Sequence, residues 1–139
     1  MDILINYKND FNKNEYKALR ASAGWSPLSD SQIDNIISNS NYKIAAYIND
    51  QIAGMARCIT DNGYLYLLCD IIISPNYQGM GIGKKMLLKF IDEIKNSIDS
   101  SYAKLYIMSL KGKEGFYKSL GFNEDIATGL AIEINKQML

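Results

Sequence analysis

Residues 76–86, NYQGMGIGKKM, place three glycines at alternate positions directly before a helical pattern. The first N–H groups of a helix have no intrahelical partner, and the positive end of the helix dipole favours anions. Residues without a Cβ let a phosphate approach the backbone, and Lys84 and Lys85 add positive charge. The stretch therefore predicts a phosphate-binding loop. The alternative is a glycine-rich turn that only starts a helix.

Three phosphate-binding templates can be tested against this loop. The P-loop pattern GxxxxGK[ST] fails because Gln78 stands at its first glycine position and Lys85 at its Ser/Thr position. The dinucleotide pattern GxGxxG fails at Lys84, which occupies the last glycine position. The remaining pattern, Gln/Arg-x-x-Gly-x-Gly/Ala, is matched by Gln78, Gly81 and Gly83. A pyrophosphate suits this third pattern because two small residues flank the helix start.

The surrounding sequence predicts an α+β order, a meander of strands followed by β-α-β-α-β. Apolar spacing predicts a long helix over residues 82–97, and a strand over 64–73 leads into the loop. Further strands are predicted at 3–7, 43–48, 51–60 and 103–108, with the last strands from Phe122 onward and at 129–134. Further helices are predicted at 14–23, from Ser29 through Ile37, and at 113–120. We expect one domain over residues 1–139.

Composition excludes several partners. The chain has 139 residues, and its 15 basic residues balance 15 acidic ones, so no net field recruits nucleic acid or an anionic membrane. The balance leaves a local basic patch open. The longest apolar run, around residues 65–73, is interrupted by Asp70 and is too short for a membrane span. The first residues lack the basic region and cleavage site of a signal peptide. We expect a cytoplasmic protein.

The chain contains no histidine. This excludes a Ser-His-Asp triad, a Cys-His pair and histidine-based zinc sites, and we expect no metal. Proton transfer must then use carboxylate, tyrosine, lysine, cysteine or water. Cys58 and Cys69 lie in predicted strands without CxxC spacing, which favours buried free thiols over a disulfide.

With the loop and its surroundings in place, the sequence resembles the GNAT superfamily of N-acetyltransferases. Residues 70–91, DIIISPNYQGMGIGKKMLLKFI, resemble the family's central acetyl-CoA motif, and residues 115–122, GFYKSLGF, resemble its later tyrosine helix and the following strand. The resemblance implies a mixed, mostly antiparallel central sheet with splayed strands 4 and 5, flanked by about four helices. It is closest to small bacterial and plastid members that acetylate amines, which have an aspartate at the Asp70 position and a Gly-Trp like Gly24 and Trp25.

The resemblance implies acetyl-CoA as cosubstrate and assigns residues to it. The pantetheine arm would lie between the splayed strands, paired with the backbone of Ile71, Ile72 and Ile73, with Met108 and Ser109 on the other side. The pyrophosphate would be held by Gln78, Gly79, Met80, Gly81, Ile82, Gly83 and Lys84. One position departs from the family pattern: Lys111 stands where many relatives have an asparagine that contacts the cofactor arm.

The resemblance also implies catalytic roles. Tyr117 resembles the family's general acid, which protonates the departing thiolate, and a phenol with a pKa of about 10 can do so. The alternative is that Tyr117 only packs the short helix or hydrogen-bonds the sulfur. Asp70 is the candidate base for the amine. The alternative is that Asp70 orders the strand splay or binds the substrate ammonium. Glu114 is a weaker candidate base, and the N–H of Ile72 is the candidate oxyanion donor.

The acceptor is predicted from three aromatic residues, Trp25, Tyr64 and Tyr66, which with Asp70 could surround an amine with an apolar body. The alternative is that these aromatics belong to the core and the strand surface. We expect direct attack of a small-molecule primary amine on the acetyl group, without a covalent enzyme intermediate. The alternatives are a protein N-terminal or lysine acetyltransferase and a non-catalytic acyl-CoA-binding module. Homodimers are common in the family, so the resemblance allows a homodimer.

Overall fold

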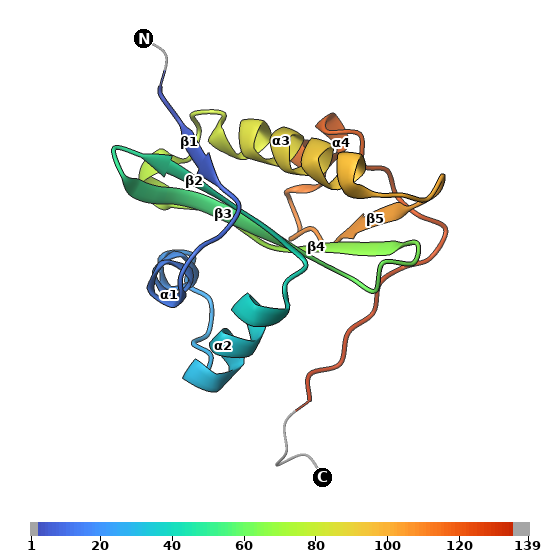
Figure 1. Ribbon diagram of the computed structural model, residues 1–139, viewed down its shortest axis with the longest axis horizontal. Helices are drawn as coiled ribbons and strands as arrows, with labels where there is room; N and C mark the ends of the chain where they lie inside the picture. The colour runs from blue at the N-terminus through green and yellow to red at the C-terminus, as the bar shows by residue number, and fades with distance from the viewer. Residues whose placement is uncertain (1–2, 135–139) are drawn as a thin grey trace. The chain divides into compact units, whose positions relative to one another are not determined.

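The computed structural model describes residues 3–134 and forms two compact units, Met1–Ile107 and Met108–Leu139. The first unit contains a five-stranded sheet in the order β1-β2-β3-β4-β5 (Figure 1). Its strands are β1 Asn6–Lys8, β2 Tyr42–Ile48, β3 Gln51–Thr60, β4 Leu65–Ile73 and β5 Lys104–Ile107. The first four pair antiparallel, and β4 pairs parallel with β5. The predicted mixed, mostly antiparallel sheet is confirmed.

The structure contains four α-helices among the described residues, and the first two begin at side-chain caps. They are α1 Lys13–Ser22, α2 Asp30–Asn39 and α3 Ile82–Ser97 in the first unit, with a short 3-10 turn η1 Pro75–Tyr77, and α4 Glu114–Ser119 in the second. Capping boxes open α1, through Asn12 and Glu15, and α2, through Ser29 and Gln32. Each box satisfies two backbone N–H groups that would otherwise lack partners.

The helices of the first unit cover both faces of the sheet. Figure 1 shows α1 and α2 on one face and α3 on the other. Because successive strand residues point to opposite faces, β3 serves both layers. Met55 packs in a cluster with Tyr16 and Ile33 from α1 and α2. Its neighbour Gly54 faces α3, where an added Cβ would lie 3.5 Å from the sulfur of Met86. Both faces of the sheet are therefore covered by helices of this unit, and in its described residues the sheet edges are not.

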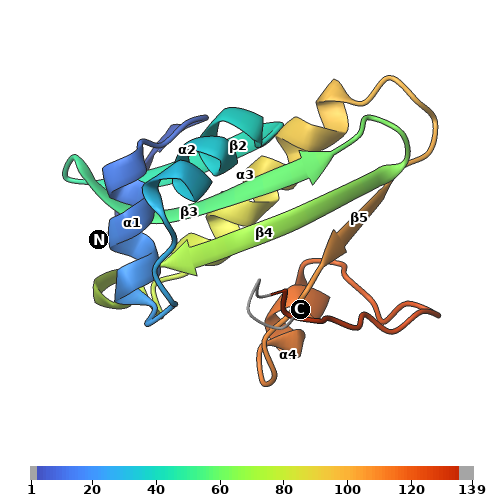
Figure 2. The same cartoon turned by 90° about the horizontal axis from the view of Figure 1, so that it is seen from below.

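The strands β4 and β5 pair only at their beginnings. Residues 65–68 of β4 pair with residues 104–107 of β5, and the pairing ends there. Figure 2 shows the two strands diverging from this paired end. Beyond it, residues 69–73 of β4 have no strand on that side within the described part of the chain. The predicted splay of strands 4 and 5 is confirmed.

The second unit contains one short helix, α4, and the segment that follows it. The predicted strands from Phe122 onward and at 129–134 are wrong, since the described residues of this segment contain no strand. The alternation of Leu130, Ile132 and Ile134 resembles a strand, but these three side chains are exposed. A strand requires a partner for its backbone groups as well as an apolar face, and this segment lacks the partner among residues 3–134. No helix among these residues has the length and apolar character needed to cross a membrane.

Candidate functional site

A β-bulge lies in β4, opposite β3. Arg57 pairs with Cys69 and Met55 pairs with Ile72, so Asp70 and Ile71 together face the single residue Ala56. Asp70 has a φ of 52°, in the left-handed region. Aspartate visits this region more readily than most residues, at a cost on the order of 1–3 kcal/mol for a non-glycine residue. The bulge sits where β4 has already left β5.

The bulge turns the Asp70 side chain toward α1. Strict alternation from Tyr66 and Leu68 would place Asp70 on the α3 face. The extra residue instead brings its carboxylate to Tyr16, whose hydroxyl donates to Oδ2 at 2.6 Å. Arg57 Nε donates to the same oxygen at 2.7 Å. The side chain of Asp70 is only 11% exposed, so these contacts take the place of solvent.

Arg20 completes this cluster from one turn further along α1. Its Nη1 lies 3.6 Å from Asp70 Oδ1, and its Nη2 donates to the carbonyl of Ser26 at 2.8 Å. The guanidinium also lies over the ring of Trp25, 5.2 Å from the ring centre, and 5.8 Å from that of Tyr16. Both carboxylate oxygens of Asp70 are thus engaged by side chains of the same chain.

Burial and hydrogen bonding set the proton affinities in this cluster. Burial, and then the hydrogen bond to Asp70, raise the pKa of Tyr16 to about 12. Burial is the largest single influence on Arg57 and disfavours its charged form, but the hydrogen bond to Asp70 and the favourable charge interactions with its neighbours together outweigh burial, and the pKa of Arg57 is raised. Burial raises the pKa of the Cys69 thiol on the neighbouring residue. At neutral pH, Tyr16 is therefore a neutral phenol and Arg57 a charged guanidinium, and both donate to Asp70.

The glycine loop follows β4 through η1. Gly79 and Gly81 have φ values of 79° and 78°, and a Cβ added to either would meet no atom within 4 Å. Gly81 is the residue before α3, and among the described residues no side chain caps this helix. The loop therefore combines open space, left-handed backbone and uncapped N–H groups, which suits a bound anion.

The remaining loop residues divide between holding the loop and facing solvent. The Gln78 side chain donates from Nε2 to the carbonyl of Ile73 at 3.0 Å, which fastens the loop to the end of β4. Met80, Lys84 and Lys85 are exposed, and Ile82 is buried beneath the helix start. The two lysines lie in the first turn of α3, where the helix dipole gives no favourable interaction with a cation.

Tyr117 belongs to α4 in the second unit. It packs edge-on against Phe116 and Phe122, with ring centres 5.1 Å and 6.2 Å away. Burial raises the pKa of Tyr117 above its ordinary value, so its phenol stays protonated at neutral pH. Glu114, the weaker candidate base, accepts a hydrogen bond from the N–H of Gly112 at 2.9 Å. This contact stabilises the turn before α4.

The three predicted acceptor aromatics do not come together. Trp25 lies against Arg20, next to the Asp70 cluster. Tyr66 is 3% exposed and packs against Tyr42, whose hydroxyl contacts Ser97 at the end of α3, so Tyr66 lies on the opposite face of the sheet. Tyr64 stacks on Tyr102, ahead of β4 and β5. Of the three aromatic residues, only Trp25 therefore lies near Asp70. Tyr66 belongs to the core, as the alternative interpretation expects.

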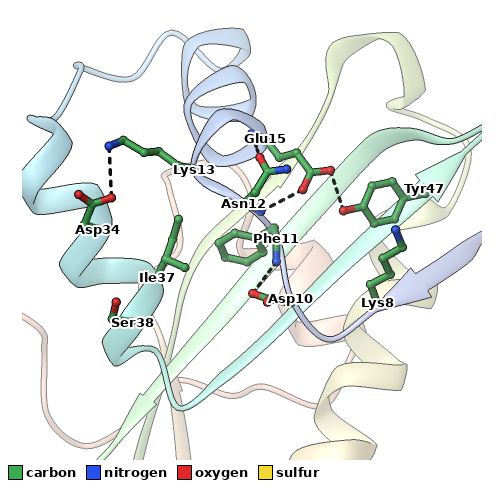
Figure 3. Close-up of a pocket in the computed structure, with 10 residues that line it drawn as sticks. All are labelled: Lys8, Asp10, Phe11, Asn12, Lys13, Glu15, Asp34, Ile37, Ser38 and Tyr47. Carbon is green, nitrogen blue, oxygen red and sulfur yellow. Dashed lines mark hydrogen bonds and ion pairs between the residues drawn. The ribbon is translucent and has the colours of Figure 1, made fainter.

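A pocket of about 590 Å³ lies on the α1 and α2 side of the first unit (Figure 3). Its charged groups already have partners: Lys13 pairs with Asp34 at 3.2 Å, and Glu15 accepts a hydrogen bond from Tyr47 at 2.7 Å. None of the predicted site residues lines it. Among residues 3–134 there is no group of three or more potential ligands positioned for a metal ion.

The family model of the acetyltransferase (GNAT) domain matches residues 10–131 of this chain. The chain belongs to the GNAT acetyltransferase family. The match spans strands β2 to β5, the glycine loop and the segment with Tyr117. The family expected from the sequence resemblance is thereby confirmed, and the protein is a GNAT acetyltransferase.

Known relatives agree with this family. An uncharacterized N-acetyltransferase, ycf52, from Pyropia yezoensis is 27% identical over 128 residues, which cover 89% of this chain and 72% of that protein. A probable acetyltransferase of unknown function from Staphylococcus aureus has a similar fold, with a TM-score of 0.84 and 24% identity over 94% of this chain and all of that one. A GNAT-family acetyltransferase from Streptococcus pneumoniae has a TM-score of 0.78 and 23% identity over 97% and 99% of the two chains. The solved structures support the GNAT fold alone.

Sequence reasoning missed the partners of Asp70 in this GNAT domain. Tyr16, Arg20 and Arg57 lie far from Asp70 in the sequence, and no spacing rule joins them. The bulge that brings them together also has no signature in the residues of β4. The capping box of Asn12 and Glu15 was missed as well, although its pattern was readable.

Proposed function

We propose that this GNAT acetyltransferase moves the acetyl group of acetyl-CoA to a primary amine of a small molecule by direct nucleophilic attack. The nitrogen of the neutral amine would form a bond to the acetyl carbon, and the bond from that carbon to sulfur would break. The coenzyme A thiolate would take a proton from an acid, and the amine would lose one to a base or to water. Acetyl-CoA supplies the activated acetyl group, and the residues of this chain supply its binding and the proton transfers.

The observation that carries the proposal is the position of the glycine loop beside the open end of β4. The strand leaves β5 after residue 68, and residues 69–73 then lead directly to the loop. An extended pantetheine arm can pair with a strand edge, while its pyrophosphate needs an anion site at a helix start. This sheet edge and this helix start are consecutive in the chain. The proposed donor contacts are Ile71, Ile72 and Ile73 for the arm and the loop residues 78–84 for the pyrophosphate.

The residues of the loop fit a pyrophosphate. The open space beside Gly79 and Gly81 allows phosphate oxygens to approach the backbone N–H groups. The side chain of Gln78 is occupied with Ile73, so we propose that Gln78 fixes the loop and contributes its backbone. Lys84 is exposed and can reach a phosphate charge. Met108 and Ser109, which follow β5, are proposed to contact the other side of the arm.

We propose Tyr117 as the acid for the departing thiolate. Burial raises its pKa, which keeps the proton in place until a strong base forms beside it. The proposal rests on the GFYKSLGF motif within the region matched by the family model. The alternative is that Tyr117 binds the sulfur without transferring a proton. Kinetics of a Tyr117 variant can distinguish the two roles.

The role of Asp70 as base stays a prediction, and its contacts favour the alternative. Both carboxylate oxygens are engaged by Tyr16, Arg57 and Arg20, so an incoming ammonium would have to displace one of them. We propose that the amine loses its proton to water and that Asp70 orders the bulge. Trp25, stacked with Arg20 beside this cluster, is the one predicted acceptor aromatic that remains next to Asp70.

The test is a thiol-release assay with acetyl-CoA and a panel of amines, in parallel with calorimetric titration of acetyl-CoA. The panel contains alkylamines, arylalkylamines and peptides with a free N-terminus or lysine. We expect turnover with a small amine. Turnover only with peptides would assign the protein to the protein acetyltransferases, and binding without any turnover would show a non-catalytic acyl-CoA-binding module. The cytoplasm is the proposed compartment, where Cys58 and Cys69 would remain the free thiols that the structure shows.

A further inference from the structure

We propose that Tyr16 and Arg57 are positioning residues for acetyl transfer, because they hold Asp70 in its left-handed conformation and so fix the backbone of the bulge. The inference rests on the proposed function, since it assigns these residues to the same reaction. It concerns the N–H groups of β4 next to Asp70, of which that of Ile72 is the candidate oxyanion donor.

The first step is that the bulge needs support. A non-glycine residue with a φ of 52° in a strand is held there by its surroundings. The Asp70 side chain supplies the attachment point, because it is short and accepts several hydrogen bonds. Tyr16 fastens it to α1 and Arg57 fastens it to β3. The bulge in β4 is therefore held by hydrogen bonds from two other elements, α1 and β3.

The second step is that the ties are strong and leave little freedom. Both donor distances, 2.6 Å and 2.7 Å, are in the range of charge-assisted hydrogen bonds. Arg57 is itself braced by its Nη1, which donates to the hydroxyl of Ser40 at 3.3 Å. The side chains of Arg57 and Asp70 are 13% and 11% exposed, so water does not compete freely for these groups. Losing one tie would widen the range of positions that the bulge samples.

The third step connects position to rate. A hydrogen bond donor aimed at a developing oxyanion acts through its geometry, and removing one donor costs roughly 10²–10³ in kcat. A donor that is displaced rather than removed should cost less, on the order of tenfold. Because the ground-state thioester is held mainly by the rest of the cosubstrate, the KM for acetyl-CoA should change little.

The chain offers a matched control. Tyr47 in β2 also donates its hydroxyl to a carboxylate, that of Glu15, at 2.7 Å, and it also ties α1 to the sheet (Figure 3). Tyr47 is 7% exposed and Tyr16 is fully buried. Tyr47 does not contact β4 through this bond. Tyr16→Phe and Tyr47→Phe therefore remove equivalent hydrogen bonds, and only the first concerns the bulge.

The experiment compares both variants with the wild type in two measurements. In steady-state kinetics, Tyr16→Phe should lower kcat by about tenfold or more with the KM for acetyl-CoA within about twofold, while Tyr47→Phe keeps both values. In two-dimensional NMR, the backbone amide signals of Asp70, Ile71 and Ile72 should change their chemical shifts in Tyr16→Phe and keep them in Tyr47→Phe.

The two measurements separate the proposals. If the wild type acetylates no amine, the proposed function fails, and the NMR comparison still decides whether Tyr16 holds the bulge. Equal effects of the two variants on kcat, or amide signals of the bulge that do not move in Tyr16→Phe, would overturn the positioning role.

Discussion

Tyr16 and Asp70 are 54 positions apart in the sequence, and the hydroxyl of the first lies 2.6 Å from the carboxylate of the second. This contact joins the first helix to the fourth strand at the point where the strand is irregular. The phenol is buried, and its neutral form is the one that donates the hydrogen bond. The stability of the fold should therefore depend on the protonation of Tyr16.

The first prediction is a loss of stability at high pH. The folded pKa of Tyr16 is about 12, above an unfolded value of about 10, so its contribution is complete below about pH 10 and is lost as the pH rises toward 12. Two pKa units correspond to about 3 kcal/mol. Urea unfolding at increasing pH should show a steeper loss for the wild type than for Tyr16→Phe. Parallel curves for the two proteins would contradict the prediction.

The second prediction concerns Gly81. Gly81→Glu should abolish acetyl-CoA binding, because it places bulk and negative charge at the proposed pyrophosphate site. Gly81→Ala is the control, since its Cβ meets no atom within 4 Å and the φ of 78° adds only backbone strain. We expect the alanine variant to lose about 1–2 kcal/mol of stability and to bind acetyl-CoA more weakly than the wild type but measurably. Calorimetric titration measures both affinities, and unchanged binding by Gly81→Glu would move the pyrophosphate elsewhere.

The third prediction concerns Tyr117. Tyr117→Phe should lower kcat by about 10²-fold or more, with a smaller effect on acetyl-CoA affinity, because the acid acts only when the thiolate leaves. Tyr102→Phe is the control, since Tyr102 is 62% exposed and stacks on Tyr64. Steady-state rates and calorimetry on both variants give the comparison. A normal rate in Tyr117→Phe would remove this residue as the acid.

The fourth prediction distinguishes two roles of Asp70. Asparagine tolerates the left-handed backbone and keeps one acceptor oxygen, so Asp70→Asn should retain kcat within about tenfold if the side chain only orders the bulge. Loss of a proton acceptor would instead cost roughly 10²–10⁴. Stability should fall by about 3 kcal/mol or more, because two buried guanidinium groups lose their counterion. Rates per folded molecule, with the folded fraction taken from urea curves, decide between the roles.

Local signals predicted most of the first unit. The capping box of Ser29 and Gln32 opens α2 as expected, and the hairpin at Asn49 and Asp50 places both residues at positive φ. Such features depend on residues close in sequence, and their physics can be read from a few letters. The strand β3, Gln51–Thr60, has the bounds that its pattern predicts.

Long-range features could not be read in the same way. The sequence indicates an aspartate in β4, but its partners come from α1 and β3, and only the folded chain shows that they meet. The aromatic residues Tyr64 and Tyr66 carry no mark of the face or end of the sheet on which they lie. The alternating pattern at 129–134 indicates strand propensity, which depends on a pairing edge that residue identities do not specify.

The start of α3 has a consequence for the stability of the folded protein as well as for its chemistry. Within the described residues this helix begins at a left-handed glycine without a side chain to complete its first turn. If the phosphates of acetyl-CoA complete that turn, the donor becomes part of the secondary structure. Binding would then add about 2.7 kcal/mol to the free energy of unfolding at a donor concentration one hundred times the dissociation constant. Because these phosphates belong to the coenzyme A part of the donor, the amount of intact enzyme in a cell would follow its supply of coenzyme A and its thioesters.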